Sequence, residues 1–408
     1  MIAHAGKKDS MKKQTHLLSW ITLACFVAGG VLGLVLPKLF TYIGVIGTVY
    51  VNLLKLMALP IVLCTVFSAA SRGIGNASGT LGRTVLLFVI LFTVSFLLCG
   101  GLYSILSPGK DLPLTVGEPW AGTAASLSWD SFLQAIFPSN LFSALSGGAM
   151  LPTILFAFFM GAVAEKVGAH KVTALIEELG TVFSRMLSCI LYLTPLGVFV
   201  LMGSCTADFG IHVLGGALSY VLYAWGGCIL ILLLVMMLPL WLFCRIGPIT
   251  YFRKTGRVLL TALSTCSSAA TLPETLRTCR EEFDVPERIV GVTAPLGCTI
   301  HMCGGAVSFC LLGLVAMQLS GRPVTVGTFL LMLVLAEALN MAAPGIPGGG
   351  IVLGATFLSL LGMTDIGLFL GMYAGIYRVL DMAYTSLNVA GDITAVLLIH
   401  RWEEKKKP

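Results

Sequence analysis

The sequence predicts an all-α polytopic membrane protein with eight transmembrane helices and two re-entrant helical hairpins. Hydrophobic residues make up 57% of the 408 positions and charged residues only 11%, whereas charged residues form about a quarter of a typical soluble domain. The apolar residues also stand in long uninterrupted blocks, whereas a transmembrane β-barrel would show short alternating segments. Soluble proteins and outer-membrane barrels are thereby excluded.

Eight segments are long enough to cross the hydrocarbon core, which takes about 20 helical residues. We expect the fourth to be a broken span, because the motifs PSN from Pro138 and SGG from Ser146 interrupt it. The eighth is the only one with several charges, and it contains Arg378, Asp381 and Asp392. The predicted spans are 17–36, 42–70, 84–106, 131–164, 186–207, 209–244, 289–321 and 366–400.

Two further apolar segments do not fit a simple span. Segment 258–273 is short and has basic residues on both sides, so we expect the stretch Ser264–Thr271 to turn at membrane depth. Segment 324–363 contains the glycine- and proline-rich stretch Asn340–Gly350, which cannot be one continuous helix. Two re-entrant hairpins that enter from opposite faces are typical of secondary transporters, which bind their substrate near the midplane.

The net charge of +6 does not indicate nucleic-acid binding, because lysines gather at the two ends of the chain beside apolar segments. Such lysines are typical of cytoplasmic flanks, so we expect a multi-pass plasma-membrane protein with both termini in the cytoplasm. With that orientation the first hairpin enters from the cytoplasm and the second from outside. The twelve cysteines show no CxxC pair and no metal-ligand spacing, which predicts small buried side chains. We expect no cofactor and no nucleic-acid partner.

The polar residues inside the last two spans are the main functional signal. Asp381, Asn388 and Asp392 are spaced by 7 and 4 residues and share roughly one helix face. An ionised Asp at the bilayer centre costs at least about 2.5 kcal/mol, which favours a functional role. Arg378 fits either a structural pair with Asp381 or a functional role. The polar run 297–305 predicts local unwinding, and freed carbonyls there can bind a cation.

Three features of the sequence each permit two interpretations. His301 fits a satisfied buried histidine as well as a proton-carrying one. The serines at 267–268 and the glycines at 345 and 348–350 fit helix packing contacts, or N–H donors for a carboxylate. N–H groups that donate to a substrate carboxylate, together with Asp381 as the partner of an ammonium group, would bind an amino-acid zwitterion.

Several long motifs, in the right order over nearly the whole chain, resemble the dicarboxylate/amino acid:cation symporter family, the glutamate transporter homologues. The resemblance implies the fold of that family, a homotrimer embedded in lipid, and an elevator mechanism in which the second hairpin is the extracellular gate. It implies a scaffold of residues 17–82 and 131–207 and a transport part of residues 83–109 and 209–400, with hairpins at about 250–282 and 324–363 and the last two spans at about 288–320 and 366–400. The motifs are LLKLMALPIVL from Leu53, PSNLFSALSGGAMLP from Pro138, TPLGVFVLM from Thr194, TCSSAATLPETLR from Thr265, APLGCTIHMCGG from Ala294, PGIPGGG from Pro344 and LDMAYTSLNVAGD from Leu380.

The same resemblance implies the site residues. Asp381 matches the aspartate that holds the substrate amino group, and Asn388 matches an asparagine that contacts the substrate. The implied substrate-binding residues are Ser267, Ser268, Gly305, Ile346, Gly350, Tyr377, Asp381, Tyr384, Thr385 and Asn388. The implied sodium ligands are Asp392 with the carbonyls of Gly297, His301 and Asn388 at one site, and Thr299, Met302, Asn340, Met341 and Ala343 at another.

The chain also departs from the family pattern. Where the family commonly reads Asn-Met-Asp-Gly-Thr, this chain reads His-Met-Cys-Gly-Gly from His301, and so loses the aspartate of a deeper sodium site. The third span around 92–95 is also poor in hydroxyls, so we expect fewer sodium ions, or a proton on His301. In the family, an arginine binds the acidic side chain of the substrate. Its position is occupied here by Tyr384, and the alternative arginine position in the first hairpin is occupied by Cys266.

We therefore expect a cation-coupled symporter of a neutral amino acid, with sodium as the coupling ion and a proton as the alternative. An acidic amino acid or dicarboxylate is the second substrate class, because Arg378 lies nearby on the last span. An anion channel or a nutrient sensor on the same scaffold belongs to a different class. An intramembrane hydrolase that uses Ser267 and His301 is disfavoured, because no acid in the sequence obviously orients the histidine. We do not expect an enzyme.

Overall fold

The computed structural model describes residues 21, 24–73, 79–112, 139–146, 150–341, 349–363 and 367–404. All regular elements in these ranges are helices, which confirms the predicted all-α class. A first helical segment covers Ala24–Val35. The labelled helices are α2 (Pro37–Gly73), α3 (Gly79–Leu106), η1 (Pro108–Asp111), α5 (Leu141–Ser146), α6 (Met150–Lys166), α7 (His170–Leu191), α8 (Thr194–Phe209), α9 (His212–Ile231), η2 (Leu232–Met237), α10 (Leu238–Cys244), α11 (Pro248–Thr265), α12 (Ser268–Arg277), η3 (Thr278–Glu282), α13 (Glu287–Ile300), α14 (Cys303–Leu319), α15 (Val326–Met341), α16 (Gly349–Leu360) and α17 (Gly367–Glu404).

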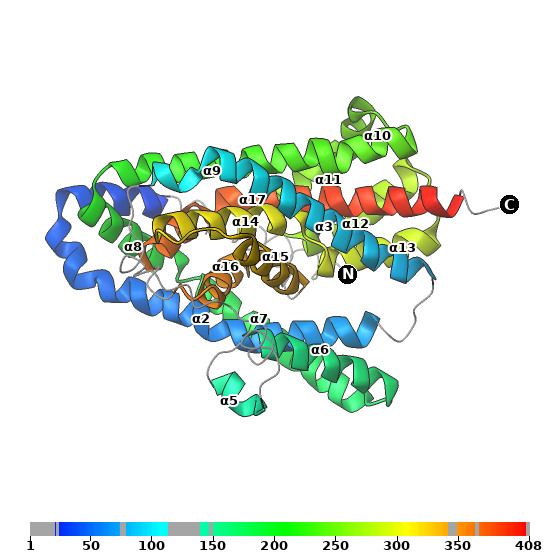
Figure 1. Cartoon of the computed structure of the whole chain (residues 1–408), viewed down its shortest axis with the longest axis horizontal. Helices are drawn as coiled ribbons and strands as arrows, with labels where there is room; N and C mark the ends of the chain where they lie inside the picture. Colours follow the sequence, from blue (N-terminus) through cyan, green and yellow to red (C-terminus); the bar gives the residue numbers. More distant parts are fainter. Residues whose placement is uncertain are drawn as a thin grey trace, which may run out of the picture.

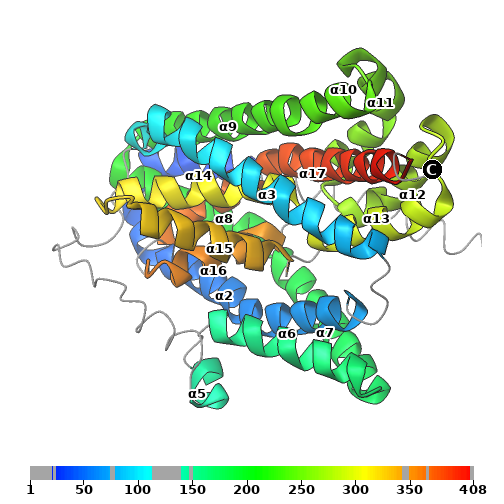
Figure 2. The same cartoon turned by 45° about the vertical axis from the view of Figure 1, so that its right-hand side comes forward.

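The helices form an elongated bundle in which α3, α9, α14 and α17 run along the long axis (Figure 1). Helices α2, α6 and α7 contact one another and lie along one side of the bundle (Figures 1 and 2). The α11–α12 pair lies toward the end of the bundle where α17 ends, and the α15–α16 pair lies toward the opposite end. The two helix pairs therefore approach the middle of the bundle from opposite ends.

Four helical segments among the described residues are long and apolar enough to cross a membrane. They are 82–106, 212–244, 287–319 and 367–404, which coincide with the predicted third, sixth, seventh and eighth spans. The 34-residue fourth prediction contains two separate described helices, α5 and α6. Asn140 starts α5, because its Oδ1 accepts hydrogen bonds from the N–H groups of Phe142 (2.9 Å) and Ser143 (3.2 Å). The count of eight spans and two re-entrant hairpins stays a prediction.

Two predicted interruptions are confirmed by the backbone. His301 (φ −119°, ψ 106°) and Met302 (φ −132°, ψ 84°) are extended, and they separate α13 from α14. Cys266 adopts a left-handed conformation (φ 50°, ψ 40°), and with Ser267 it turns the chain from α11 into α12. The glycine-rich tip at 342–348 lies outside the described residues.

The fifth span differs from its prediction. The sequence suggested one segment, 186–207, but the structure begins a helix at His170 and interrupts it at Tyr192 and Leu193 before α8. The first helix, α7, is amphipathic and carries several charges, so a search for uncharged runs cannot detect it. Pro195, the second residue of α8, has no N–H to continue the ladder from α7.

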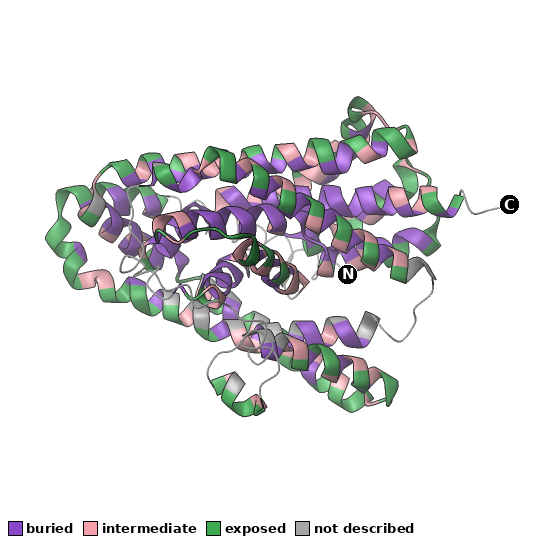
Figure 3. Cartoon of the chain, viewed as in Figure 1, coloured by how far each residue is buried: buried purple, intermediate pink, exposed green. Residues whose placement is uncertain are grey.

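Burial is greatest in the helices that carry the predicted functional residues. Figure 3 shows α14 and the greater part of α17 as buried, whereas α2, α7 and α9 each expose one side. Most of α17 from Phe369 to Leu397 is buried, although this segment includes Asp381, Asn388 and Asp392. A helix that is buried nearly all round must hold its polar side chains against other protein groups, since water cannot solvate them there.

Gly203 provides a test of this packing. It lies on α8 against the ring of Phe40 on α2, and a Cβ at position 203 would overlap that ring, which is itself 1% exposed. We expect Gly203→Ala to destabilise the detergent-solubilised protein by about 1–3 kcal/mol, as overpacking does elsewhere. The measurement is the midpoint of thermal unfolding.

The matched control is Gly215→Ala on α9, where no atom from another described part of the chain lies within 4 Å of the added Cβ. Since alanine favours helix over glycine, this variant should be as stable as the wild type or slightly more so. Equal destabilisation of both variants would show that the α2–α8 contact is not as tight as the structure indicates.

Candidate functional site

A cavity lies where α17 meets the beginning of α14 and the inner ends of the two helix pairs. Eight of the ten predicted substrate-binding residues line it: Ser268, Gly305, Gly350, Tyr377, Asp381, Tyr384, Thr385 and Asn388. The other lining residues are Cys266, Met302, Gly304, Ser308, Phe309, Asn340 and Leu353. Of the two remaining predictions, Ser267 lies at the turn beside Ser268, and Ile346 lies outside the described residues.

Asp381 is the acidic group of this cavity. Its side chain is largely buried, and its Oδ1 accepts a hydrogen bond from Thr385 Oγ1, one turn further along α17, at 3.1 Å. This bond fixes the carboxylate on the cavity side of the helix and leaves acceptor capacity, because an ionised carboxylate has about four lone-pair sites. The cavity can therefore receive a group that donates several hydrogen bonds, such as an ammonium.

Asn388 joins α17 to the break in the preceding helix. Its Oδ1 accepts a hydrogen bond from the Gly304 N–H at 2.7 Å, and both residues line the cavity. Gly304 belongs to the first turn of α14, where backbone N–H groups have no acceptor within the helix. Gly304 also packs directly on the Tyr384 backbone, so no side chain fits at position 304.

The α11–α12 turn brings hydroxyl and amide groups to the same cavity. Ser267 caps α12, because its Oγ accepts a hydrogen bond from the Ala270 N–H at 3.2 Å. Ser268 is the first residue of α12 and lines the cavity, as does Cys266 before it. The N-terminus of α12 thus lies at the cavity wall, an arrangement that favours an anionic group.

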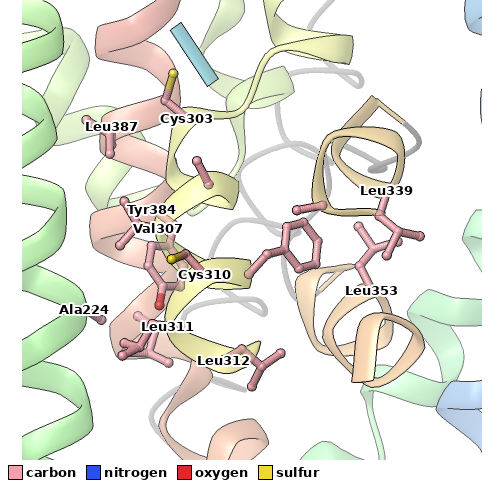
Figure 4. Close-up of a cluster of buried hydrophobic side chains, with 14 of the residues drawn as sticks. Ala224, Cys303, Val307, Cys310, Leu311, Leu312, Leu339, Leu353, Tyr384 and Leu387 are labelled. Carbon is pink, nitrogen blue, oxygen red and sulfur yellow. The ribbon is translucent and has the colours of Figure 1, made fainter. Parts of the chain in front are cut away.

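The cavity wall has no cationic side chain among the described residues that line it. Tyr384 is buried at the position where the sequence departs from the family arginine, and its Oη has no hydrogen-bond partner in the described part of the chain. Figure 4 shows Tyr384 and Leu387 among the α14 side chains Cys303, Val307 and Cys310. Arg378, one turn before Asp381 on α17, is not among the lining residues.

Some of the predicted cation ligands lie together. The Asn340 carboxamide of α15 meets the backbone of Met302 at the helix break, and in the orientation that satisfies both groups it donates to the Met302 carbonyl (3.0 Å) and accepts from its N–H (3.3 Å). Thr299 is exposed, and its Oγ1 donates to the Leu296 carbonyl at 2.8 Å. Met341 ends α15, and Ala343 lies outside the described residues.

The other predicted cation site contains an unforeseen contact. Asp392 is 2% exposed and lies so close to Gly297 that a Cβ at position 297 would overlap its Oδ1, and this Oδ1 is 3.1 Å from Nδ1 of the His301 side chain. Nε2 of the imidazole lies 3.0 Å from Cys303 Sγ. The ring also stacks on Phe88 of α3, with ring centroids 4.3 Å apart. The prediction used only the His301 carbonyl, so the side chain is an additional partner for the carboxylate.

Sequence reasoning missed one polar residue of this region. Glu337 of α15 has an Oε2 that is buried and has no hydrogen-bond partner among the described residues. The signal was present, because Glu337 is the only acid in the apolar run 324–341. The contact of Phe88 with His301 joins residues 213 positions apart and left no local pattern.

Comparison with known proteins supplies the family. The model of the sodium:dicarboxylate symporter family matches residues 17–402. The chain belongs to this family. Its members are membrane transporters that carry amino acids or dicarboxylates together with a cation, and the resemblance inferred from the motifs is confirmed.

Several curated relatives match over almost their full length. The proton/sodium-glutamate symport protein of Geobacillus stearothermophilus is 27% identical over 401 residues, which cover 95% of this chain and 94% of the relative. The C4-dicarboxylate transport protein 1 of Pseudomonas aeruginosa is 29% identical over 92% of this chain and 86% of its own. The human neutral amino acid transporter A is 26% identical over 97% of this chain and 83% of its own. These relatives share the family but differ in the substrate that their names give.

The Gly304–Asn388 bond can be tested without any substrate. Asn388→Leu removes the acceptor and leaves a buried N–H unpaired, which costs about 1–3 kcal/mol. We expect a lower thermal unfolding midpoint in potassium buffer, with neither sodium nor amino acid present. Ser386→Ala is the control, because among the described residues Ser386 Oγ bonds only to the Met382 carbonyl of its own helix (2.8 Å). If both variants lose the same stability, the bond between α14 and α17 contributes nothing measurable.

Proposed function

We propose that this chain is a secondary active transporter that imports a neutral amino acid together with a cation. The observation that carries the proposal is the composition of the cavity: one carboxylate, Asp381, faces backbone and hydroxyl donors, and no lysine or arginine is among the described lining residues. In such a cavity the positive group of a zwitterion is compensated by Asp381, and its negative group is compensated by the hydrogen-bond donors. A second carboxylate on the substrate would have no cation there and would be costly to desolvate.

Each end of the substrate has a natural partner in this proposal. The ammonium binds Asp381, whose orientation is held by Thr385. The carboxylate binds N–H and hydroxyl groups at Ser268 and at the start of α16, where Gly350 lines the cavity. Gly350 packs on the hydroxyl of Tyr377, so the α16 terminus meets the Tyr377 side chain of α17 and no side chain fits at position 350. The substrate side chain points toward Tyr384 and Thr385.

Coupling to a cation follows from the place of the helix break. Asn340 pairs with Met302, so the α15–α16 pair contacts the backbone next to the cavity. A sodium ion bound by Thr299, Met302, Asn340, Met341 and Ala343 would hold this pair closed over the substrate. Since linkage is reciprocal, sodium and substrate would then strengthen each other's binding.

The larger-scale proposals concern the cycle and the assembly. We propose a homotrimer in the plasma membrane with cytoplasmic termini, in which residues 17–82 and 131–207 form the scaffold. Residues 83–109 and 209–400 would move as an elevator, with the α15–α16 pair as the extracellular gate. In support, two glycines of α17 face the scaffold: Gly371 packs on Leu201 of α8, and Gly375 packs on Phe26 and on Val198 of α8.

Acidic substrates remain the second candidate, and a specific observation favours them. Two of the relatives named above carry glutamate or a C4-dicarboxylate by name, although another is a neutral amino acid transporter. In this alternative Arg378 supplies the missing positive charge. Arg378→Ala should then abolish aspartate uptake, whereas the neutral-substrate proposal expects no aspartate uptake to lose.

The proposed function is tested by the thermal stability of the purified protein against a panel of amino acids, in sodium and in potassium buffers at two pH values. A ligand that binds the native state at 100 times its Kd adds about 2.7 kcal/mol of stability. Stabilisation by neutral amino acids in sodium alone supports sodium symport. Stabilisation that is equal in potassium and changes with pH would indicate that the coupling ion is a proton. Stabilisation by aspartate or glutamate alone refutes the neutral substrate.

Uptake into proteoliposomes separates transport from other activities. Asp381→Ala should abolish amino-acid uptake, because the ammonium loses its only charged partner among the described lining residues. A current that persists without substrate would indicate an anion channel, and binding without exchange would indicate a sensor.

Substrate charge is tested by Tyr384→Arg. The new guanidinium would lie on the cavity wall and could pair with a second carboxylate, so we expect aspartate uptake to appear while neutral uptake falls. Tyr384→Phe is the matched control, because it keeps the ring and adds no charge. Aspartate uptake in the Tyr384→Phe variant, or in neither variant, would contradict the assignment of this position.

A further inference from the structure

The His301 side chain is enclosed on every edge, at the depth where the cation sites are expected. It lies in the extended break between α13 and α14, and its side chain has no exposed surface. Nδ1 faces Asp392 Oδ1 at 3.1 Å, and Nε2 faces Cys303 Sγ at 3.0 Å. One face stacks on Phe88 with an interplanar angle of 10°. The Cε1 edge rests on Gly391, where an added Cβ would lie 2.7 Å away.

These contacts assign one hydrogen-bond direction to each ring nitrogen. An ionised Asp392 only accepts, so Nδ1–H donates to it, and in a neutral ring Nε2 is then the acceptor for the Cys303 thiol. Both ring nitrogens therefore have partners, and the ring orientation is fixed by three helices: α3 through Phe88, α14 through Cys303 and α17 through Asp392 and Gly391.

The order Cys303–His301–Asp392 is also that of a nucleophile, a base and an orienting acid. A hydrolytic role does not follow, however, because Cys303 is fully buried and is not among the residues that line the cavity. No substrate can approach the sulfur in this arrangement. The His301–Asp392 pair must therefore act within the protein, on the Asp392 carboxylate itself.

A sodium ion at Asp392 would need several oxygen ligands around it, since hard cations prefer oxygen. On the side of α3 and α14 the carboxylate instead meets the imidazole of His301, and the imidazole is in turn enclosed by the Cys303 thiol and the Phe88 ring. The deeper site expected beside it has lost its acid at Cys303, and Ser95 of α3 already donates to its own helix, to the Leu91 carbonyl at 2.6 Å. The donor set on this side does not fit sodium.

We propose that the imidazole of His301 takes the place of a coupling cation at Asp392. The ring N–H supplies the partner that the buried carboxylate requires, and it stays bound through the whole cycle because it is covalently part of the chain. His301 is in this role a positioning residue, and sodium binds only at the other site, near Met302 and Asn340. The proposal rests on the proposed symport function and specifies its ion requirement.

The test measures how steeply substrate affinity depends on sodium. Each coupled sodium ion contributes one power of its concentration, so at low sodium one additional ion gives about a tenfold further gain in affinity for a tenfold rise in sodium. In a His301→Asn/Cys303→Asp double variant, oxygen ligands replace the imidazole and the thiol. We expect its plot of log Kd against log sodium concentration to be steeper by one unit than that of the Cys303→Asp single variant, which gains the same acid but keeps the imidazole.

The matched control is Cys303→Ser, which keeps the imidazole and a hydroxyl donor for Nε2. Its slope should equal that of the wild type. A wild-type slope equal to or steeper than that of the double variant overturns the proposal. So does a control variant with the slope of the double variant, because the imidazole would then not decide the ion count.

A second measurement covers the case in which the double variant does not fold. The wild-type protein, crystallised with thallium(I) in place of sodium, is expected to show no anomalous peak in contact with Asp392 Oδ1, and a peak there overturns the proposal. The failure of the proposed function is distinguishable from this result. If the wild type binds no amino acid in any buffer of the panel, symport itself fails, whereas amino-acid binding with a thallium peak at Asp392 refutes only the role of His301.

Discussion

The structure depends on one constraint: a helix that stops inside the bundle leaves polar backbone groups that the surrounding protein must bind. The break at His301–Met302 frees the first N–H groups of α14 and the last carbonyls of α13. Asn388 accepts from one of those N–H groups, and Asn340 binds the Met302 backbone on the other side. The broken helix is thus held between α17 and the α15–α16 pair. A binding cavity forms where these three elements meet, and an unbroken helix there would offer it no backbone donors.

The same constraint explains which features the sequence could predict. A break needs glycine, proline or polar residues in an apolar run, so the interruptions near His301 and at the Cys266–Ser267 turn could be predicted from composition alone. The face shared by Asp381 and Asn388 follows from helical spacing, and both line the cavity. Helix α7 could not be found in this way. Its charged residues interrupt the apolar ones along the sequence, so a search for uncharged segments does not detect it.

Contacts between distant segments were beyond sequence reasoning. Asp392 could be assigned to a cation site because its position matched a motif, but the motif says nothing about a side chain 91 residues earlier. His301 alone fits a satisfied buried histidine or a proton carrier, and only the geometry shows that both ring nitrogens and one ring face are already in contact. The interpretation of His301 as a satisfied buried histidine therefore agrees with the contacts of its ring.

Replacing a mobile cation with a fixed imidazole changes what the site can contribute to transport. A bound ion adds driving force because its concentration differs across the membrane, whereas a side chain is present on both sides and adds none. A chain with fewer ions concentrates its substrate less, but it also binds that substrate with less dependence on external sodium. The hydrogen bond from His301 lowers the cost of burying the Asp392 carboxylate without an ion. The sodium that remains coupled would then bind next to Asn340, beside the contact of α15 with the Met302 backbone, where it could act on the proposed gate.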